Sequence, residues 1–593
     1  MIPLFRKLPK KFADNNQYLK YAIGEIVLVV IEFLTVLQIN KWNVIKNEKI
    51  RINRILSILL VISMFSCSDK TNKNEQNQRQ NILLIVADDL GYADVGCYGG
   101  DIETPNIDGL ASEGIRFSSF HTAPLCAPTR AMLLSGNDNH IAGMGNMLMR
   151  PSEEFGYERR LTNRIVTIPS LLKEAGYHTY MAGKWHLGST PESNPHQKGF
   201  EHSFVLLEGA GNHYNSQSVL RKGYSNYTED GEPTKWKDGD YSTDFYTNKI
   251  IEYIDEDKDD DKPFFAFAAF TSPHWPLQVD KKYWEKYKGF YDEGYDKLKE
   301  KRLETLKKAG MIPQDAELPP NDERVKPWES LSDEIKIKEA RKMELYAGMV
   351  DNLDYNIGRL VNHLKEIGEY ENTLIVFMSD NGAAWRDLIE VSEVLKEYYN
   401  DDYENMGNAN SYISYGPQWA EASSSPFRYF KDFTTQGGIN APMIISGSNI
   451  KNENEIHNGL VTVMDLAPTF YDVAQISYPK TFENHEVYPL KGNSLMPYIL
   501  GKTNEIHAPD YVFGMEHNGY AMIRKGDWKI TNTIKPFHVD HFELYNLSSD
   551  LAEMHNLKLS EPIKYAEMLM EWDKFSKEIK VQLPNQPEIN HKE

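Results

Sequence analysis

One cysteine stands in a setting that could make it reactive. Cys126 comes two residues before Pro128, and a short apolar run follows and ends at Gly136. Proline fits the first turn of a helix because that turn leaves its N–H without a partner, and glycine commonly ends a helix. The spacing predicts a helix that begins near Cys126, with Arg130 one turn further on. The start of a helix favours an anion, although a lone cysteine could also be a buried structural residue.

Oxygen-bearing side chains follow two predicted strands that are far apart in the sequence. Residues 81–86 and 373–378 are continuous apolar runs, which is typical of strands buried on both faces of a parallel sheet. The residues just after these strands include Asp88, Asp89, Asp380 and Asn381. Ligands bind beyond the carboxyl ends of such strands, so these side chains can face one another. Together they would make an all-oxygen site suited to Ca²⁺ or Mg²⁺.

Three further segments bring cationic and histidine side chains to the same region. Residues 178–181 and 264–270 resemble strands, and residues 443–445 form another apolar run. The residues associated with these segments are Lys184, His186, His274 and Lys431. Taken singly, each histidine could be a core or loop residue and each lysine a surface charge. Taken together, they would place several positively charged or protonatable side chains beside the carboxylates and the cysteine.

The elements that must position these side chains indicate an α/β protein. Residues 343–366 have apolar side chains at helical spacing and predict a helix packed on the sheet. After about residue 505, short β-like runs and a helix at about 562–579 predict a smaller unit. We therefore expect a large mixed, mostly parallel sheet sandwiched by helices, followed by a smaller C-terminal domain with a short antiparallel sheet and a helix.

Length, charge and cysteine content limit the possible functions. The chain has 593 residues and a formal net charge of −21, which favours two packed units and argues against nucleic acid as a partner. The acidic surface would also repel an anionic substrate, so an anion site must be a local group of cations. Cys67, Cys97 and Cys126 are too few for a disulfide scaffold or a cysteine-rich zinc site.

Two apolar runs precede the predicted sheet. Residues 22–37 contain two glutamates and are short for a membrane span. Residues 55–65 follow basic residues and lead to Cys67, a pattern similar to a bacterial lipoprotein signal in which Cys67 would be lipidated. An ordinary membrane anchor or a cleavable signal is the alternative. We expect an exported protein, periplasmic or anchored to the outer membrane of a bacterium, with residues 1 to about 50 as an extension ahead of the signal.

From about residue 81 to the C-terminus, six motifs in this order resemble those of the type I sulfatases. They are Asp88-Asp89, Cys126-Ala-Pro-Thr-Arg130, Gly183-Lys-Trp-His-Leu-Gly188, Pro273-His-Trp-Pro276, Asp380-Asn-Gly382, and Lys431 ahead of Gly437-Gly438. The similarity is closest to the bacterial arylsulfatases and implies the alkaline phosphatase-like fold. It further implies that a formylglycine-generating maturation enzyme oxidises Cys126, and that the hydrated aldehyde attacks sulfate monoesters of aryl groups or carbohydrates.

The resemblance also implies a metal cofactor, Ca²⁺ with Mg²⁺ as a possible substitute. The expected ligands are Asp88, Asp89, Cys126 as formylglycine, Asp380 and Asn381. The metal would polarise a sulfate oxygen and lower the pKa of the attacking hydroxyl, and the carboxylate of Asp380 is a candidate acceptor for its proton.

The remaining residues receive catalytic and substrate-binding roles from the same resemblance. Lys184 and Lys431 would neutralise the sulfate oxygens, and Arg130 would orient the formylglycine. His274, with Lys431, would bind the substrate and protonate the departing alcohol. His186 would assist the release of sulfate.

The predicted organisation has four parts. Residues 1–67 form an N-terminal extension with a signal or lipoprotein-type segment, and residues 68–80 form a polar tether. Residues 81–505 form the catalytic domain, which contains a charged, helical-looking insertion at about 281–341. Residues 506–593 form the C-terminal domain.

Two other functions remain open at this stage. A phosphomonoester or phosphonate hydrolase of the same superfamily would share the sheet and the metal position. A Ser or Thr nucleophile and a second, His-rich metal site would favour that activity, whereas this sequence has a cysteine at the nucleophile position and one evident metal cluster. A binding lipoprotein with an inactive site is the other alternative. The filled set of catalytic positions argues against that alternative.

Overall fold

The computed structural model describes residues 79–147, 151–236, 239–260, 262–387, 393–448, 450–451 and 453–583. The predicted signal, Cys67 and nearly all of the tether lie outside these ranges. No helix within them is both long enough and apolar enough to cross a membrane. The described residues all belong to one compact unit.

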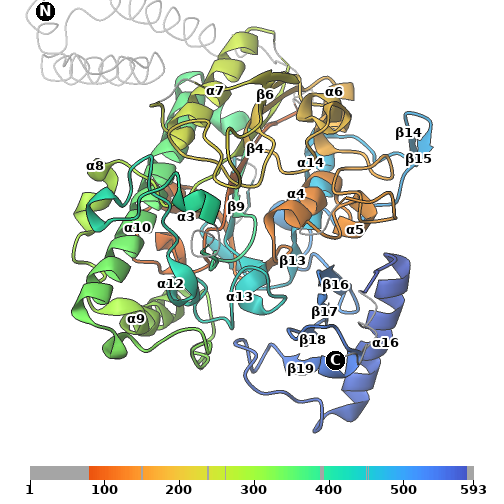
Figure 1. The fold of residues 1–593 in the computed structure, drawn as a ribbon. Helices are drawn as coiled ribbons and strands as arrows, with labels where there is room; N and C mark the ends of the chain where they lie inside the picture. Colours follow the sequence, from red (N-terminus) through yellow and green to blue (C-terminus); the bar gives the residue numbers. More distant parts are fainter. Residues whose placement is uncertain are drawn as a thin grey trace, which may run out of the picture. The chain divides into compact units, whose positions relative to one another are not determined.

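Among the described residues, ten strands form the main sheet (Figure 1). In spatial order they are β12 (Glu455–His457), β2 (Gly114–Phe117), β11 (Met443–Ser446), β9 (Thr373–Ser379), β1 (Asn81–Ala87), β8 (Phe264–Ala269), β4 (His178–Lys184), β5 (His202–Leu206), β6 (Tyr227–Glu229) and β7 (Glu232–Thr234). The five strands from β9 to β5 are parallel. β11 is antiparallel to both of its neighbours, so the sheet is mixed but mostly parallel, as predicted.

The register brings the carboxyl ends of four strands to one edge of the sheet. Ala87 of β1 pairs with Ser379 of β9, and Val86 pairs with Ala269 of β8. Ala269 in turn pairs with Gly183 of β4. The segments that leave these strands therefore begin beside one another, although they are far apart in the sequence.

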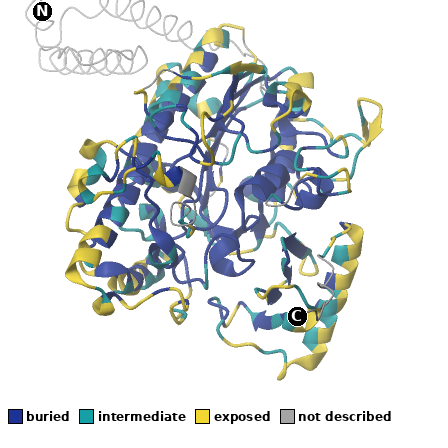
Figure 2. Ribbon diagram, in the orientation of Figure 1, coloured by how far each residue is buried: buried dark blue, intermediate teal, exposed yellow. Residues whose placement is uncertain are grey.

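Helices cover both faces of the sheet because its central strands are apolar on both sides. Ile82, Leu84 and Val86 of β1 belong to one hydrophobic cluster, and Leu83 and Ile85 belong to another. The helices that share the cluster of Leu83 include α3 (Pro105–Ser112), α7 (Ser242–Asp257) and α10 (Asp333–Glu366). The helices that share the cluster of Ile82 include α4 (Cys126–Ser135), α6 (Ile168–Glu174) and α14 (Leu466–Ala474). Figure 2 shows the strands buried between these two layers.

The charged insertion consists of short and medium helices. α8 (Lys281–Trp284) and α9 (Gly294–Ala309) precede α10, which begins ten residues before the predicted helix at 343–366. Ser332 explains the earlier start, because its side chain accepts a hydrogen bond from the N–H of Ile335 and caps the helix. The apolar spacing detected only the part of α10 that packs on the sheet.

A smaller antiparallel sheet follows near the C-terminus. Its strands, in spatial order, are β16 (Val512–His517), β17 (Tyr520–Lys525), β18 (Trp528–Asn532) and β19 (Glu543–Asn546). Met568 and Trp572 of α16 (Pro562–Glu578) are buried against this sheet. The predicted small sheet with one helix is confirmed.

Candidate functional site

The predicted site residues come together at the carboxyl edge of the main sheet. Asp88 and Asp89 follow β1, Lys184 ends β4, His274 follows β8, and Asp380 and Asn381 follow β9. Lys431 lies just before the short helix α13 (Gln436–Ile439). All of these side chains and those of Cys126 and Arg130 are buried.

Cys126 occupies the first position of α4, as its sequence setting predicted. Leu125 before it is extended, and Gly136 ends the helix with a left-handed φ of 64°. The thiol lies at the positive end of the helix dipole and is almost completely buried. Burial is the largest effect on this group and raises the pKa of the Cys126 thiol to about 12, although Lys184 and Lys431 oppose the shift.

The Asp89 carboxylate connects four predicted site residues. Lys431 Nζ donates a hydrogen bond to Asp89 Oδ1, and Asn381 Nδ2 donates to the same oxygen at 2.6 Å. Cys126 Sγ lies 3.8 Å from that oxygen and 3.1 Å from Lys431 Nζ. His274 Nε2 is 3.3 Å from Asp89 Oδ2. The carboxylate is therefore the centre of the cluster.

Two other ion pairs flank Asp89. Lys184 Nζ donates to both oxygens of Asp88, at 2.8 and 2.7 Å. The Arg130 guanidinium donates to Asp380 Oδ2 at 3.0 Å and to the carbonyl of Lys184 at 2.8 Å. Three carboxylates thus face three cations, and the paired charges offset much of the cost of burying them.

The environment separates the pKa values of the carboxylates. Burial alone would raise the pKa of Asp89, but the neighbouring cations lower it well below its usual range. The lysines Lys431 and Lys184 carry this effect, because burial lowers the pKa of His274 to about 3 and leaves that imidazole neutral. Burial and the neighbouring Asp88 raise the pKa of Asp380 to about 6. The two acids therefore differ strongly in proton affinity although both lie in one buried cluster.

Glycines bring the cationic segments close to the sheet. Gly183 has a left-handed φ of 118°, and a Cβ on it would lie 1.8 Å from the carbonyl oxygen of Ala269. A Cβ on Gly437 would lie 2.0 Å from the carbonyl oxygen of Tyr429. Any larger residue would force β4 away from β8, or α13 away from the segment that carries Lys431.

The cluster has the chemistry of a site for a hard divalent cation. Ligand atoms of Asp88, Asp89, Cys126 and His274 all lie within 4.8 Å of one another. Asn381 Oδ1 is buried and accepts no hydrogen bond, and the same holds for Asp89 Oδ2 although His274 is near. Buried oxygens without a donor are uncommon, and carboxylate and amide oxygens are the ligands that Ca²⁺ and Mg²⁺ prefer.

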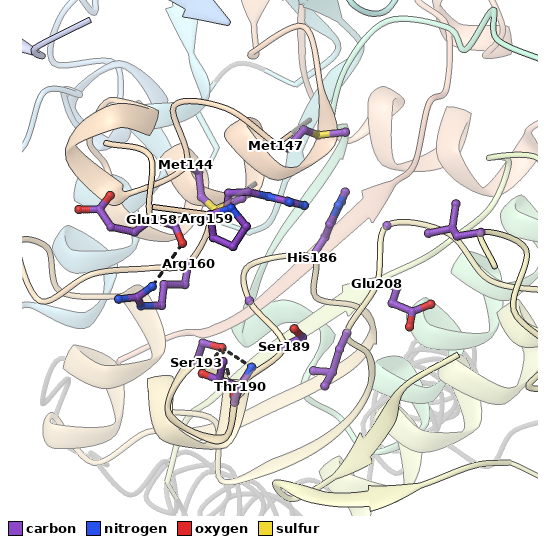
Figure 3. Close-up of a pocket in the computed structure, with 15 residues that line it drawn as sticks. Met144, Met147, Glu158, Arg159, Arg160, His186, Ser189, Thr190, Ser193 and Glu208 are labelled. Carbon is purple, nitrogen blue, oxygen red and sulfur yellow. Dashed lines mark hydrogen bonds between the residues drawn. The ribbon is translucent and has the colours of Figure 1, made fainter. Parts of the chain in front are cut away.

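His186 lies toward a pocket of about 310 Å³ rather than within the Asp89 cluster (Figure 3). Its backbone is left-handed, with φ of 60°, and its ring packs on Gly209, where a Cβ would lie 2.4 Å from the ring. Burial lowers the pKa of His186 well below its usual value, and Lys184 adds to this shift. Among the predicted site residues, His186 alone lines this pocket.

The sequence analysis did not identify two residues that support the site. His213 Nε2 lies 3.1 Å from the carbonyl oxygen of His274 and fixes that segment. Asp432 has a left-handed φ of 83° and accepts hydrogen bonds from Trp385 Nε1 at 2.7 Å and Arg386 Nε at 2.8 Å. Asp432 was detectable in principle because it directly follows the site lysine, whereas His213 has no comparable signal in the sequence.

Comparisons with known proteins agree with this arrangement. The family model described as Sulfatase matches residues 80–476, and the model described as N-sulphoglucosamine sulphohydrolase, C-terminal, matches residues 427–581. An uncharacterized sulfatase of Schizosaccharomyces pombe is 41% identical, and the match covers 84% of this chain and 94% of that protein. An arylsulfatase of Klebsiella aerogenes is 40% identical, and the match covers 71% of this chain and 92% of that protein.

A solved structure extends the similarity to three dimensions. The crystal structure of Ps i-CgsB in complex with k-i-k-neocarrahexaose has a TM-score of 0.60 and 26% identity. The match covers 86% of this chain and 94% of that chain. The chain therefore belongs to the sulfatase family and is a sulfuric ester hydrolase.

Proposed function

We propose that this sulfatase acts through a formylglycine made from Cys126 and through a bound divalent cation. The observation that carries the proposal is the position of Cys126 at the start of α4, with Sγ 3.1 Å from Lys431 Nζ. Formylglycine supplies a hydrated aldehyde, one hydroxyl of which is a nucleophile for sulfur. A nucleophile held beside two lysines meets the sulfate group where its negative charge is neutralised.

Five side chains would hold the cation. They are Asp88, Asp89, Asp380, Asn381 and the modified Cys126. The uncompensated oxygens of Asp89 and Asn381 support this assignment. When bound, the cation would supply Lewis acidity toward a sulfate oxygen and toward the hydroxyl of the modified Cys126. Its identity as Ca²⁺, with Mg²⁺ as a substitute, is part of the proposal.

The other side chains neutralise the charge of the sulfate group and transfer protons. Lys184 and Lys431 exchange part of their contact with Asp88 and Asp89 for contact with the sulfate oxygens. Arg130 holds Asp380 and thereby orients the nucleophile. Burial lowers the pKa of His274 to about 3, so Lys431 supplies the proton to the departing alcohol oxygen while the neutral imidazole of His274 contacts that oxygen. His186 takes the proton whose loss releases sulfate and restores the aldehyde.

The mass of the peptide that contains Cys126 tests the nucleophile. The protein would be produced in a host with a formylglycine-generating enzyme and, as a control, in one without it. We expect the aldehyde mass in place of the thiol only in the first preparation, together with hydrolysis of 4-nitrophenyl sulfate. Cys126→Ala should abolish turnover in both. An intact thiol in an active enzyme from the competent host would refute the proposal.

Removal of the metal tests the cofactor. Chelator-treated enzyme should lose activity and regain it with Ca²⁺ or Mg²⁺. Saturating Ca²⁺ should raise the midpoint of thermal unfolding by about 2–4 °C, because a ligand that binds only the folded state stabilises it. Asn381→Leu should remove most of this thermal shift. An equal shift in this variant would exclude Asn381 as a ligand.

The natural substrate is proposed as an aryl sulfate or a sulfated carbohydrate fragment. The similarity to the Klebsiella aerogenes arylsulfatase supports the first class, and the k-i-k-neocarrahexaose in complex with Ps i-CgsB supports the second. Measuring kcat/KM of the mature enzyme for an aryl sulfate and for a sulfated carbohydrate fragment would compare the two substrate classes directly.

We also propose that the protein is exported and anchored through lipidated Cys67 in the periplasm or at the outer membrane. The basic residues, the apolar run at 55–65 and the cysteine after it support this location. The motif Cys126-Ala-Pro-Thr-Arg130 supports maturation by a separate formylglycine-generating enzyme. Cys67→Ser should move the protein from the membrane fraction to the soluble fraction of cells.

A further inference from the structure

Glu553 is a buried carboxylate outside the Asp89 cluster that contacts a segment of the site. It belongs to the loop after β19, and its side chain is fully buried. Its Oε2 accepts a hydrogen bond from the backbone N–H of Gln436 at 2.7 Å, across 117 positions of the sequence. This contact therefore connects the loop of the C-terminal sheet with the segment that carries Lys431.

The loop around Glu553 fixes the direction of its carboxylate. Glu553 has a left-handed φ of 55°. Asp550 holds the same loop, because its carboxylate accepts hydrogen bonds from the N–H groups of Met554 at 3.0 Å and His555 at 2.7 Å. A left-handed residue other than glycine costs free energy and persists only where its surroundings hold it in place.

Lys529 of β18 balances the charge of Glu553. Its Nζ lies 2.7 Å from Glu553 Oε1, and neither side chain is exposed. Burial lowers the pKa of Lys529 to about 8 although Glu553 opposes the shift, so the pair is ionic at neutral pH. A buried ion pair is seldom more stabilising than apolar side chains of the same size, so stability alone is a weak reason for this one.

The carboxylate of Glu553 supplies an acceptor that the start of α13 lacks. Thr435 precedes this helix, and its side chain makes no capping hydrogen bond. The N–H groups of the first turn have no partner within a helix. Glu553 therefore takes the place of a capping side chain, from a distant part of the chain.

α13 in turn holds the backbone on both sides of Lys431. The N–H of Gly437 donates to the carbonyl of Arg428 at 3.1 Å. A Cβ on Gly438 would lie 1.9 Å from the carbonyl oxygen of Phe433, so the helix packs directly on this segment. A displacement of α13 would move the backbone that carries Lys431.

We infer that Glu553 is a positioning residue for Lys431. By accepting the N–H of Gln436 it holds α13, and α13 holds the segment that places the Lys431 ammonium beside Cys126. The inference rests on the proposed role of Lys431 in the hydrolysis of sulfate esters. It gives the C-terminal sheet a part in the reaction through the position of the backbone and not through contact with the substrate.

Two matched variants test the hydrogen bond itself. Glu553→Leu with Lys529→Met, the acceptor-free variant, removes the acceptor and the ion pair together and leaves no buried charge without a partner. Glu553→Gln with Lys529→Met, the acceptor-retaining variant, also removes the ion pair, but its amide oxygen can still accept the N–H of Gln436. The measured quantity is kcat for 4-nitrophenyl sulfate, divided by the fraction of protein that carries the aldehyde at Cys126. This division removes differences in maturation.

The acceptor-free variant should lower kcat by about 10- to 100-fold, because a small displacement of a catalytic group costs this much. The acceptor-retaining variant should stay within about fivefold of the wild type. The same comparison in the Lys431→Met background separates positioning from general damage. There the two variants should differ by less than about threefold, because the side chain that Glu553 positions is absent.

Gln436→Pro removes the same hydrogen bond from the donor side. Proline is accepted at the first position of a helix, which Gln436 occupies in α13. This variant should lower kcat by about 10- to 100-fold alone and by less than about threefold in the Lys431→Met background. It replaces the acceptor-free variant in the comparison if the unfolding midpoint shows that the latter does not fold.

Equal kcat values for the acceptor-free and acceptor-retaining variants would overturn the inference. A difference between them that is the same with and without Lys431 would also overturn it, because that result would indicate a purely structural role. If Lys431→Met alone has the kcat of the wild type, the proposed role of Lys431 fails and the inference fails with it. A loss in Lys431→Met together with full activity of the acceptor-free variant would refute only the role of Glu553.

Discussion

Lys431 joins the carboxylate centre of the site to its sulfur atom. Its ammonium group donates to Asp89 and lies 3.1 Å from Cys126 Sγ. Burial would favour the neutral amine, but Asp89 and the other acids raise the pKa of Lys431 well above its usual value. A full positive charge is therefore available beside Cys126, where the proposed reaction would develop negative charge.

Lys431→Met should lower kcat by about 100- to 1,000-fold, the typical loss for one electrostatic contact to a transition state. Methionine keeps much of the side-chain volume, so the fold should persist. The measurement is the turnover of 4-nitrophenyl sulfate by the mature variant, together with its unfolding midpoint. Exposed Lys480→Met is the control and should retain activity. Unchanged turnover in Lys431→Met would remove this lysine from the mechanism.

The sequence could predict the residues at the ends of long buried strands. Asp88, Asp380 and their neighbours follow continuous apolar runs, and the parallel register brings such ends together. His213 could not be found in this way. Its position depends on a contact between two loops, which leaves no periodic pattern in the sequence.

At the scale of elements, the C-terminal sheet is tied to the helix layer through a buried histidine. His140 of α5 (Asn139–Ala142) lies between Asp138, at 3.3 Å, and Glu516 of β16, at 2.9 Å. Burial alone would lower the pKa of His140, but its hydrogen bonds to Asp138 and Glu516 raise it to about 9. The imidazolium therefore connects two elements that are separated by more than 370 residues.

This contact makes part of the stability dependent on pH. A histidine whose pKa is raised by folding stabilises the native state fully below about pH 6.5, and this contribution is lost as the pH rises through about 9. The shift corresponds to a contribution on the order of 3 kcal/mol to the free energy of unfolding. His140→Gln should lower the unfolding midpoint strongly at pH 6 and much less at pH 9.5.

Exposed His555→Gln provides the control, because its side chain is 72% accessible. Its unfolding midpoint should follow that of the wild type at both pH values. A destabilisation of His140→Gln that is the same at pH 6 and pH 9.5 would show that the charge on the imidazole does not contribute.

The long elements were predictable, whereas the short ones were not. β1, β8 and β9 each contain six or seven residues of nearly continuous apolar sequence and match their predicted positions closely. β3 (Phe120–His121) and β13 (Val461–Thr462) have two residues each, too few to form a pattern. The division into domains at residue 505 stays a prediction, since the described residues on both sides of it belong to one compact unit.

At the scale of the whole molecule, the substrate and the enzyme have charges of the same sign. The net charge of −21 repels a sulfate ester at long range, while the site cations attract it only at short range. Added salt shortens the Debye length from about 30 Å at 0.01 M to about 8 Å at 0.15 M and screens the repulsion first.

Between these two NaCl concentrations, kcat/KM for 4-nitrophenyl sulfate should therefore rise by about two- to fivefold, with kcat nearly constant. The doubly charged sulfate ester of 4-hydroxybenzoate should show the larger increase. Initial rates at low substrate concentration provide the measurement. A fall in kcat/KM with salt would mean that the local positive field, and not the net charge, governs the encounter.

The burial of Cys126 also limits the time during which the thiol is accessible for the oxidation proposed above. The thiol is about 1% exposed once folded, and 305 residues separate it from Lys431, one of the groups that enclose it. At ribosomal speeds of about 5–20 residues per second, synthesis of that interval takes about 15 to 60 s. A maturation enzyme would have this period, and little after it, to reach the thiol, so the active fraction of the protein would be set by competition between oxidation and folding.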